Sequence, residues 1–288
     1  MRLLVADTHS HSNPIRGLGA SRIAERFKKE GGWFMALVSL SPWAYNIDFE
    51  GFESYVKVVD LHLRECKEAE EEGLKIACLA GFHPADVDRL IDKYRIEPGN
   101  VLELGLRVVE YLENLCREGV LDGIGEVGRQ HYKTSPERVL IASAIMERAM
   151  QAARDYGCII HLHLENSGKI TVELVDRAYR RLGADNKATS RIVFHHANPK
   201  TAMEAIARGY SASVPGIPRL VEAAISRLEP SFTLESDHID DPYRPGTVTY
   251  PWDMALLLKR LLERGVVDSS YLEKINVDLV EKIYKVSP

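Results

Sequence analysis

Eight short apolar runs alternate with longer amphipathic stretches along this chain of 288 residues, and no other feature constrains the fold as strongly. Strands separated by helical patterns predict parallel pairing through βαβ units. The expected strands cover residues 3–9, 33–41, 75–83, 123–128, 158–165, 191–197, 210–215 and 232–237. The expected helices cover residues 21–30, 53–72, 102–118, 136–156, 170–182, 199–207, 217–227, 251–263 and 271–285.

Polar and ionisable residues recur at the carboxyl ends of nearly all the expected strands. In a barrel of alternating strands and helices, those ends meet at one face and carry the functional site. We therefore expect an α/β fold, a (β/α)₈ TIM barrel, with residues 1–288 forming one domain. The competing fold is an open doubly wound sheet.

Composition places the chain among ordinary globular proteins. The hydrophobic content is 45% and the net charge is −5, so no overall basic surface indicates nucleic-acid binding. No apolar run approaches the ~18 residues of a membrane span, and no signal sequence is evident. The four cysteines, Cys66, Cys78, Cys116 and Cys158, are widely spaced and form no CxxC pair. We expect reduced thiols and a cytoplasmic location.

Histidines concentrate at the strand ends. Asp7, His9 and His11 alternate along the first strand and therefore point to one face. Two imidazoles at this spacing can reach one divalent cation, and a carboxylate behind them can orient a ring. Of the ten histidines, only His62 lies within an expected helix, where we predict a solvated side chain.

The other strand ends supply what a two-metal site requires. Glu126 lies near the end of the fourth expected strand at the position of a bridging carboxylate, and Asp237 ends the eighth at the position beside a metal-activated water. We predict that His9 and His11 bind one metal, and that one histidine each from strands five and six binds the other. The sequence thus predicts two divalent ions, with zinc preferred and manganese or magnesium as alternatives, and catalytic roles for Asp237 and Glu126.

These motifs carry a family resemblance that covers most of the chain. It resembles the TatD-like metal-dependent hydrolases of the amidohydrolase superfamily, and most closely an archaeal branch of predicted hydrolases with GEVGRPHY and ETDYIDDPRRPG segments. The segments that match in order are Asp7-Thr8-His9-Ser10-His11, Gly81-Phe82-His83-Pro84, Gly125–Tyr132 and Glu235–Gly246.

The resemblance also selects among neighbouring histidines. His161 and His163 share a face of strand five, so the residues alone leave both open. The branch's C-P-V-Q-L-H-T-E segment implies that His163 is the ligand, and its V-K-H-Y-A segment implies His195 rather than His196. Adjacent strand residues face opposite ways, so we expect only one of His195 and His196 to point inward.

The chain departs from the better-known TatD enzymes at two positions. Gln130 and Glu165 stand where those enzymes carry an aspartate and an arginine, so a specificity built on that arginine does not transfer. We predict substrate-binding roles for His83 and Arg129. Arg244 suits an anionic ligand or a structural ion pair.

The function we expect is metal-dependent hydrolysis by an activated water, on a phosphodiester or on a C–N or ester bond. Nucleic acid enters this prediction only as a substrate, and a small-molecule substrate is the alternative. Two rival functions are a metal-binding regulatory barrel without catalysis and a histidinol-phosphatase-like (PHP) phosphoesterase. The second rival generally holds a third metal and more histidines.

Overall fold

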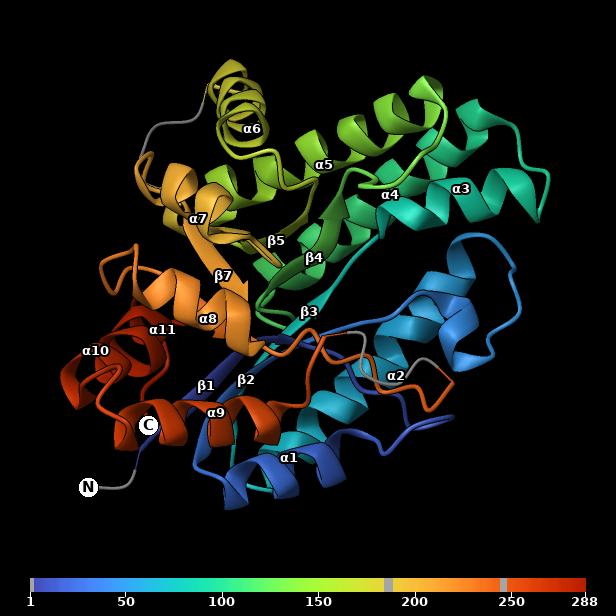
Figure 1. The fold of residues 1–288 in the computed structure, drawn as a ribbon. Coiled ribbons are helices and arrows are strands. Elements are labelled where there is room, and N and C mark those ends of the chain that lie inside the picture. The colour runs from blue at the N-terminus through green and yellow to red at the C-terminus, as the bar shows by residue number, and fades with distance from the viewer. Residues whose placement is uncertain (1–2, 184–188, 244–247) are drawn as a thin grey trace.

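The computed structural model describes residues 3–183, 189–243 and 248–288, and within them eight parallel strands form a barrel in sequential order (Figure 1). All eight strands that the sequence predicts are present, most of them shorter than expected. They are β1 (Val5–Ser10), β2 (Gly32–Val38), β3 (Lys75–Ala80), β4 (Gly123–Gly128), β5 (Ile159–His163), β6 (Ile192–Phe194), β7 (Ser211–Pro215) and β8 (Thr233–Glu235).

Hydrogen bonds between the first and last strands bring the two edges of the sheet together. The backbone N–H of Asp237 donates to the carbonyl oxygen of His9 at 2.9 Å, and the Thr8 hydroxyl donates to the carbonyl oxygen of Leu234 at 3.0 Å. These contacts join β1 to the end of β8 and close the barrel. The (β/α)₈ barrel is therefore confirmed, and the open doubly wound sheet is excluded.

The helices lie around the outside of the strands (Figure 1). They are α1 (Ala20–Lys29), α2 (Phe52–Glu71), α3 (Pro84–Asp92), α4 (Pro98–Arg117), α5 (Pro136–Tyr156), α6 (Lys169–Arg181), α7 (Pro199–Ile206), α8 (Pro218–Ile225), α9 (Pro251–Glu263), α10 (Ser269–Glu273) and α11 (Leu279–Tyr284). The sequence did not predict α3, because its short pattern follows directly on a strand end. The predicted C-terminal helix is divided between α10 and α11 by a π-helical segment, η3 (Lys274–Asp278).

The apolar strands are buried on both faces. Every residue of β2 is buried, because helices cover the outside and side chains of neighbouring strands fill the interior. Phe27, Phe82 and Phe194 are among the largest fully buried side chains. Such a packed barrel holds the strand ends rigidly relative to one another, as a site built from several strands requires.

The π-helical segment attaches the C-terminal helices to the strands. The side-chain Oδ1 of Asn276 accepts a hydrogen bond from the backbone N–H of Ala6 at 3.1 Å, and its carbonyl oxygen accepts one from Trp33 Nε1 at 2.9 Å. Asn276 is fully buried. Because water does not reach these groups, each bond lost leaves a polar group unsatisfied.

We predict that Asn276→Ala destabilises the protein by about 1–3 kcal/mol, because the buried Ala6 N–H loses its acceptor. Urea unfolding of both proteins measures the difference. Asp278→Ala, at an exposed position of the same segment, is the control and should change stability little. Equal stability of the two variants would contradict this prediction.

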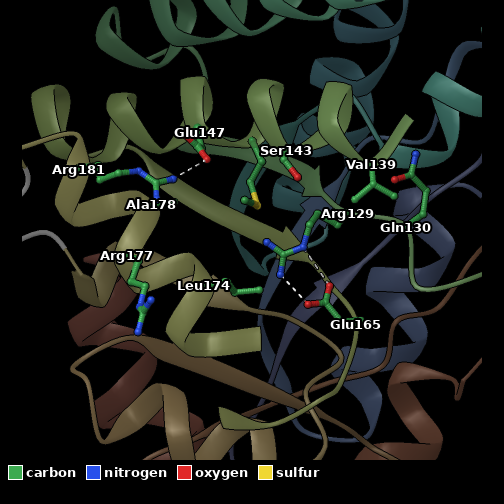
Figure 2. A pocket seen from close by; sticks show the side chains of 11 residues that line it. Arg129, Gln130, Val139, Ser143, Glu147, Glu165, Leu174, Arg177, Ala178 and Arg181 are labelled. Carbon is green, nitrogen blue, oxygen red and sulfur yellow. Dashed lines mark hydrogen bonds and ion pairs between the residues drawn. The ribbon is translucent and has the colours of Figure 1, made fainter. Parts of the chain in front are cut away.

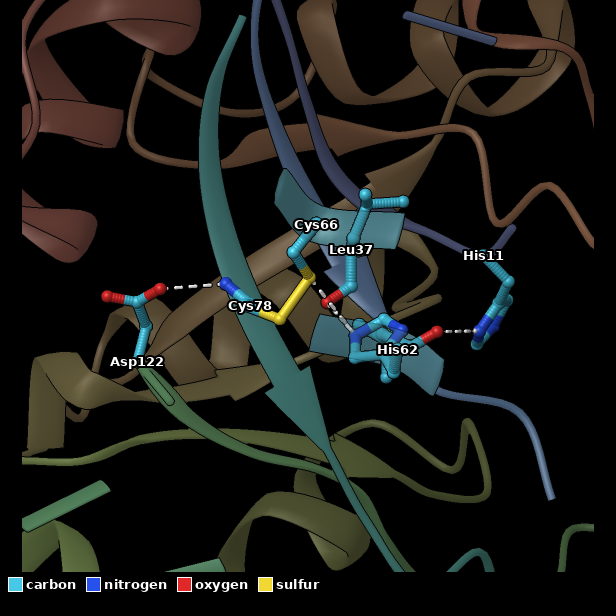
Figure 3. The surroundings of a disulfide bond; sticks show 7 residues. His11, Leu37, His62, Cys66, Cys78 and Asp122 are labelled. Carbon is cyan, nitrogen blue, oxygen red and sulfur yellow. Dashed lines mark hydrogen bonds between the residues drawn. A yellow bond between two sulfur atoms is a disulfide. The ribbon is translucent and has the colours of Figure 1, made fainter. Parts of the chain in front are cut away.

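The structure corrects the expectation of reduced cysteines. Cys66 of α2 is bonded to Cys78 of β3 (Figure 3), and Cys116 of α4 is bonded to Cys158 before β5. Their spacing in sequence hides this proximity, since folding brings the Cα atoms to 6.0 and 6.2 Å, within the range that a disulfide spans. The cytoplasmic location therefore loses the support that reduced thiols lent it, and it stays a prediction.

His62 also differs from its prediction. Its side chain is fully buried rather than solvated, and Nε2 lies 3.2 Å from the carbonyl oxygen of Leu37 and 3.5 Å from Cys66 Sγ (Figure 3). It faces the barrel because α2 packs against β2 and β3 at this point.

Among the described residues, no helix combines the length and the apolar character that a membrane crossing needs.

Candidate metal centre

Glu126 of β4 lies at the centre of the carboxyl-terminal face of the barrel, and its side chain is buried. Its Oε1 atom lies 2.8 Å from His9 Nε2, 3.2 Å from His11 Nε2 and 3.7 Å from His195 Nε2. His9 lies in β1, His11 directly follows that strand, and His195 directly follows β6. One carboxylate oxygen thus faces imidazole nitrogens from two segments that lie far apart in the sequence.

The second oxygen of Glu126 faces another pair of rings. Oε2 lies 2.9 Å from His83 Nε2 and 3.0 Å from His163 Nδ1. Glycine at position 81 lets the chain after β3 lie against the backbone of Glu126, since a Cβ atom there would lie 2.3 Å from the backbone carbonyl oxygen of Glu126. A carboxylate with a separate set of nitrogens at each oxygen has the arrangement that a bridge between two metals needs.

Asp237 completes the group of predicted ligands. Its Oδ1 lies 3.9 Å from His11 Nε2, and its side chain is partly exposed at the mouth of the barrel. The division of these ligands between two metals stays a prediction. Ligand atoms of His9, Glu126, His195 and Asp237 lie within 4.8 Å of one another, and so do those of His83, Glu126 and His163.

The hydrogen bonds of His11 decide where its lone pair lies. Its Nδ1 is 2.7 Å from the carbonyl oxygen of Val38, which can only accept, so Nδ1 carries the proton. Nε2 is then the unprotonated nitrogen, and it faces Glu126. An imidazole held by a backbone carbonyl in this way is typical of a metal ligand.

A longer chain of hydrogen bonds orients His9. The Tyr284 hydroxyl donates to the carbonyl oxygen of Thr8 at 3.2 Å, so it accepts from His161 Nε2 at 2.9 Å. His161 Nδ1 is then unprotonated and accepts from His9 Nδ1 at 2.8 Å. His9 Nε2 is left with a lone pair directed at Glu126. Both nitrogens of His161 are therefore engaged in positioning His9.

A carboxylate stands behind His195. Glu235 Oε1 lies 3.6 Å from His195 Nδ1, near enough for an ionic contact but beyond hydrogen-bond distance, while His195 Nε2 is on the side of Glu126. Glu235 is fully buried and also accepts from the backbone N–H of His196. Glu235 belongs to a motif that carries the family resemblance, but the sequence predicted no role for it, nor for Tyr284, which lies in the last helix.

Asp7 acts differently from the predicted orientation of a ring. Its carboxylate accepts from the backbone N–H of Ser236 at 2.8 Å and from the Ser236 hydroxyl at 2.5 Å. Burial raises the pKa of Asp7 to about 7. Asp7 therefore joins the end of β8 to β1 and supports the position of Asp237, while the backbone carbonyl of Val38 and the side chain of His161 orient the rings.

Burial favours the neutral form of His9, His163 and His195, whereas at His11 the contact with Glu126 outweighs burial and raises the pKa. Burial lowers the pKa of His9 and of His163 to about 4, so both rings are uncharged at pH 7 and available to a metal. Burial opposes ionisation of Glu126, but the surrounding rings, led by His195 and His83, outweigh it and hold its pKa well below the usual range. Neutral imidazoles around an ionised carboxylate are the donor set that divalent zinc binds, so these residues fit a metal pair.

His83 lies close enough to Glu126 to bond it directly. Its Nδ1 accepts from the backbone N–H of Ala85 at 3.0 Å, at the start of α3, so the proton is on Nε2. Nε2 then donates to Glu126 Oε2. The sequence predicted a substrate-binding role for His83, which stays a prediction, and this contact places the ring against the carboxylate of Glu126.

Arg129 pairs with Glu165 in a bidentate contact, at 2.6 and 3.1 Å (Figure 2). The pair lines a cavity of about 540 Å³ between α5 and α6, and Figure 2 shows Arg177 and Arg181 on the far side. Glu165 is one of the two departures from the better-known TatD enzymes, and Arg129 directly precedes the other, Gln130. The substrate-binding role of Arg129 stays a prediction, and Arg244 lies outside the described residues.

A second group of histidines lies beside the metal centre. Ligand atoms of His131, His163 and His196 lie within 4.8 Å of one another. The sequence predicted that His196 points away from the barrel interior, and this was wrong. Strand β6 ends at Phe194, so strand alternation no longer applies, and His196 adopts a left-handed backbone conformation with φ 42°.

Comparison with known proteins agrees with this geometry. A family model described as "TatD related DNase" matches residues 6–285. The uncharacterized protein MJ1127 of Methanocaldococcus jannaschii is 27% identical over 287 residues, covering 98% of this chain and 96% of that protein.

Solved structures share the fold at low sequence identity. The phosphotriesterase homology protein of Escherichia coli, complexed with phosphate in its active site, has a TM-score of 0.62 and 14% identity, with 99% of each chain covered. A variant of the organophosphorus hydrolase of Deinococcus radiodurans has a TM-score of 0.63 and 14% identity, covering 98% of this chain and 93% of that one. At these identities the likeness concerns the fold.

We predict that His163→Ala reduces bound metal more than His161→Ala does. His163 offers a nitrogen to the centre, whereas both nitrogens of His161 are engaged elsewhere. Loss of an orienting residue costs about 10–100-fold in metal affinity, less than loss of a ligand. Metal titration of the two purified variants makes the comparison, and a greater loss in His161→Ala would show that the ligand is misassigned.

Proposed function

This chain belongs to the family of TatD-related DNases, and from that premise we propose that it hydrolyses phosphodiester bonds with the help of two divalent metal ions. His9, His11, Glu126, His163, His195 and Asp237 are the residues that we propose hold the ions. The observation that carries the proposal is the position of Glu126, each of whose carboxylate oxygens faces its own set of imidazole nitrogens.

The ions, when bound, supply Lewis acidity and lower the pKa of water in the site. Zinc is the expected ion, because imidazole nitrogens dominate the donor set, and manganese or magnesium are the alternatives. Glu126 holds the two halves of the centre together, and the hydrogen bond from His83 keeps the carboxylate in place.

Asp237 is the proposed acceptor for the proton of the attacking water. It combines a position beside the ligands with access to solvent at the mouth. In the metal-free protein, burial and the charge of Glu126 raise its pKa to about 7. Cations at the centre favour its ionised form, which is the form that accepts a proton.

The substrate class is supported by the family description and by the phosphate in the Escherichia coli neighbour. Nucleic acid is a candidate only as the molecule that is cleaved, since the chain has no overall positive charge. A small phosphodiester is the alternative, and C–N or ester bonds are the competing bond types. The Arg129–Glu165 pair changes the surroundings of the site relative to the better-known enzymes.

We predict that Asp237→Asn keeps the fold and much of the bound metal but lowers kcat by roughly 10²–10⁴-fold, the usual cost of losing a general base. The amide retains the shape of the side chain and an oxygen ligand, yet it cannot take up a proton. Steady-state kinetics and elemental analysis of the same preparation test this. A variant with near-normal kcat would rule out Asp237 as the acceptor.

We predict one or two divalent ions per chain in protein purified without chelator, and a higher Tm after zinc or manganese is added. Both follow from ligands that only the folded state brings together. Elemental analysis and thermal unfolding measure these quantities. Metal-loaded protein should then be assayed on phosphodiesters, phosphomonoesters, esters and lactones. Absence of metal together with an unchanged Tm would refute the proposal.

A further inference from the structure

The triangle of His131, His163 and His196 lies beside the proposed metal pair and has no role in it except through His163. The ring centroids are 4.8 Å apart for His131 and His163, 4.6 Å for His163 and His196, and 5.5 Å for His131 and His196. Three nitrogens so close together can hold a cation through lone pairs or an anion through N–H groups. The positions of the protons decide between the two.

The loop after β5 determines the proton position on His196. The backbone N–H of Asn198 donates to Asn166 Oδ1 at 2.8 Å, which fixes the orientation of that side-chain amide. Asn166 Nδ2 therefore faces His196, 3.2 Å from Nδ1 and 3.0 Å from the carbonyl oxygen. Because Nδ2 is a donor, Nδ1 of His196 accepts, and the ring proton is on Nε2.

The Nε2–H group of His196 is a hydrogen-bond donor without an acceptor among the described residues. Nε2 is buried, and it has no hydrogen-bond partner in the described part of the chain. A buried N–H without an acceptor is unfavourable, so the structure maintains it at a cost. Such a group beside a reaction centre is placed to bind an oxygen of the substrate.

His163 contributes a second donor. Its Nδ1 faces Glu126 Oε2 at 3.0 Å and is the nitrogen assigned to the metal, so the neutral ring keeps its proton on Nε2. A cation in the triangle would require His163 to lose this second proton and His196 to move its own. His131, exposed on the loop after β4, supplies the third ring.

We propose that this triangle is an oxyanion site that binds a phosphoryl oxygen of the substrate. The inference rests on the proposed function and makes it more specific. Hydrogen bonds to a charged acceptor are stronger than those to a neutral one, so the triangle favours phosphate esters over carboxylic esters and amides. A phosphoryl group has several oxygens, so one reaches the metal centre while another meets the Nε2–H of His196.

The test is Asn166→Asp, which replaces the amide donor with an acceptor of the same shape. The carboxylate accepts a hydrogen bond from His196 Nδ1–H and so favours the tautomer with its proton on Nδ1, in which Nε2 is unprotonated and turns from donor to acceptor. We expect side-chain ¹⁵N shifts to report the proton on Nε2 in the parent and on Nδ1 in the variant. Binding of inorganic phosphate, measured by calorimetry on zinc-loaded protein, should weaken about tenfold or more.

Two further variants keep the result interpretable. Ser167→Asp adds the same negative charge at the next, exposed residue and should bind phosphate as the parent does. His196→Ala removes the donor without adding charge, and should weaken phosphate binding and raise KM for a phosphodiester while the chain keeps its zinc. His196→Ala still decides the matter if Asn166→Asp fails to fold.

The inference is overturned if Asn166→Asp and His196→Ala bind phosphate like the parent, or if the parent binds a third equivalent of zinc that His196→Ala loses. Failure of the proposed function looks different, because the parent itself would then lack metal or hydrolyse nothing. Phosphate binding is measured directly, so it decides the inference even where no turnover is detected.

Discussion

The buried carboxylate of Glu126 is the interaction on which the functional face of the barrel depends. A charged group in this position is unfavourable unless donors or cations surround it. Here imidazoles from β1 and from the ends of β3, β5 and β6 converge on its two oxygens. The closed parallel barrel brings the carboxyl ends of these strands to one face, so the contacts around Glu126 depend on the fold.

A second layer of contacts gives those imidazoles their chemistry. The carbonyl oxygen of Val38 fixes His11, and the path through His161 to Tyr284 fixes His9. Tyr284 belongs to the last helix, which η3 attaches to the base of the barrel through Asn276. The C-terminal helices therefore influence proton positions at a site formed largely by the first two-thirds of the chain.

The positions of the ring protons distinguish the cluster around Glu126 from the neighbouring triangle of His131, His163 and His196, although both clusters are rich in histidine. Hydrogen bonds leave Nε2 of His9 and of His11 unprotonated on the side of Glu126, as cation ligands need, while His83 donates to the carboxylate. At the triangle, Asn166 leaves His196 with an N–H directed into the site, as an anion site needs. Residue type alone suggests metal in both places, and hydrogen-bond partners distinguish them.

The sequence by itself predicted the barrel, because strand alternation and helix periodicity are local properties and strand ends must meet in this fold. It also predicted the six proposed ligands, but the choice of His163 and His195 came from the family resemblance and not from the strand pattern. Tertiary structure alone decided which histidine orients another, since His161 and His163 share a face and differ only in depth. It also decided the burial of His62, the pairing of Cys66 with Cys78, and the inward position of His196. Each of these features depends on contacts between segments that are distant in sequence, or on the residue at which a strand ends. The local sequence pattern predicts neither.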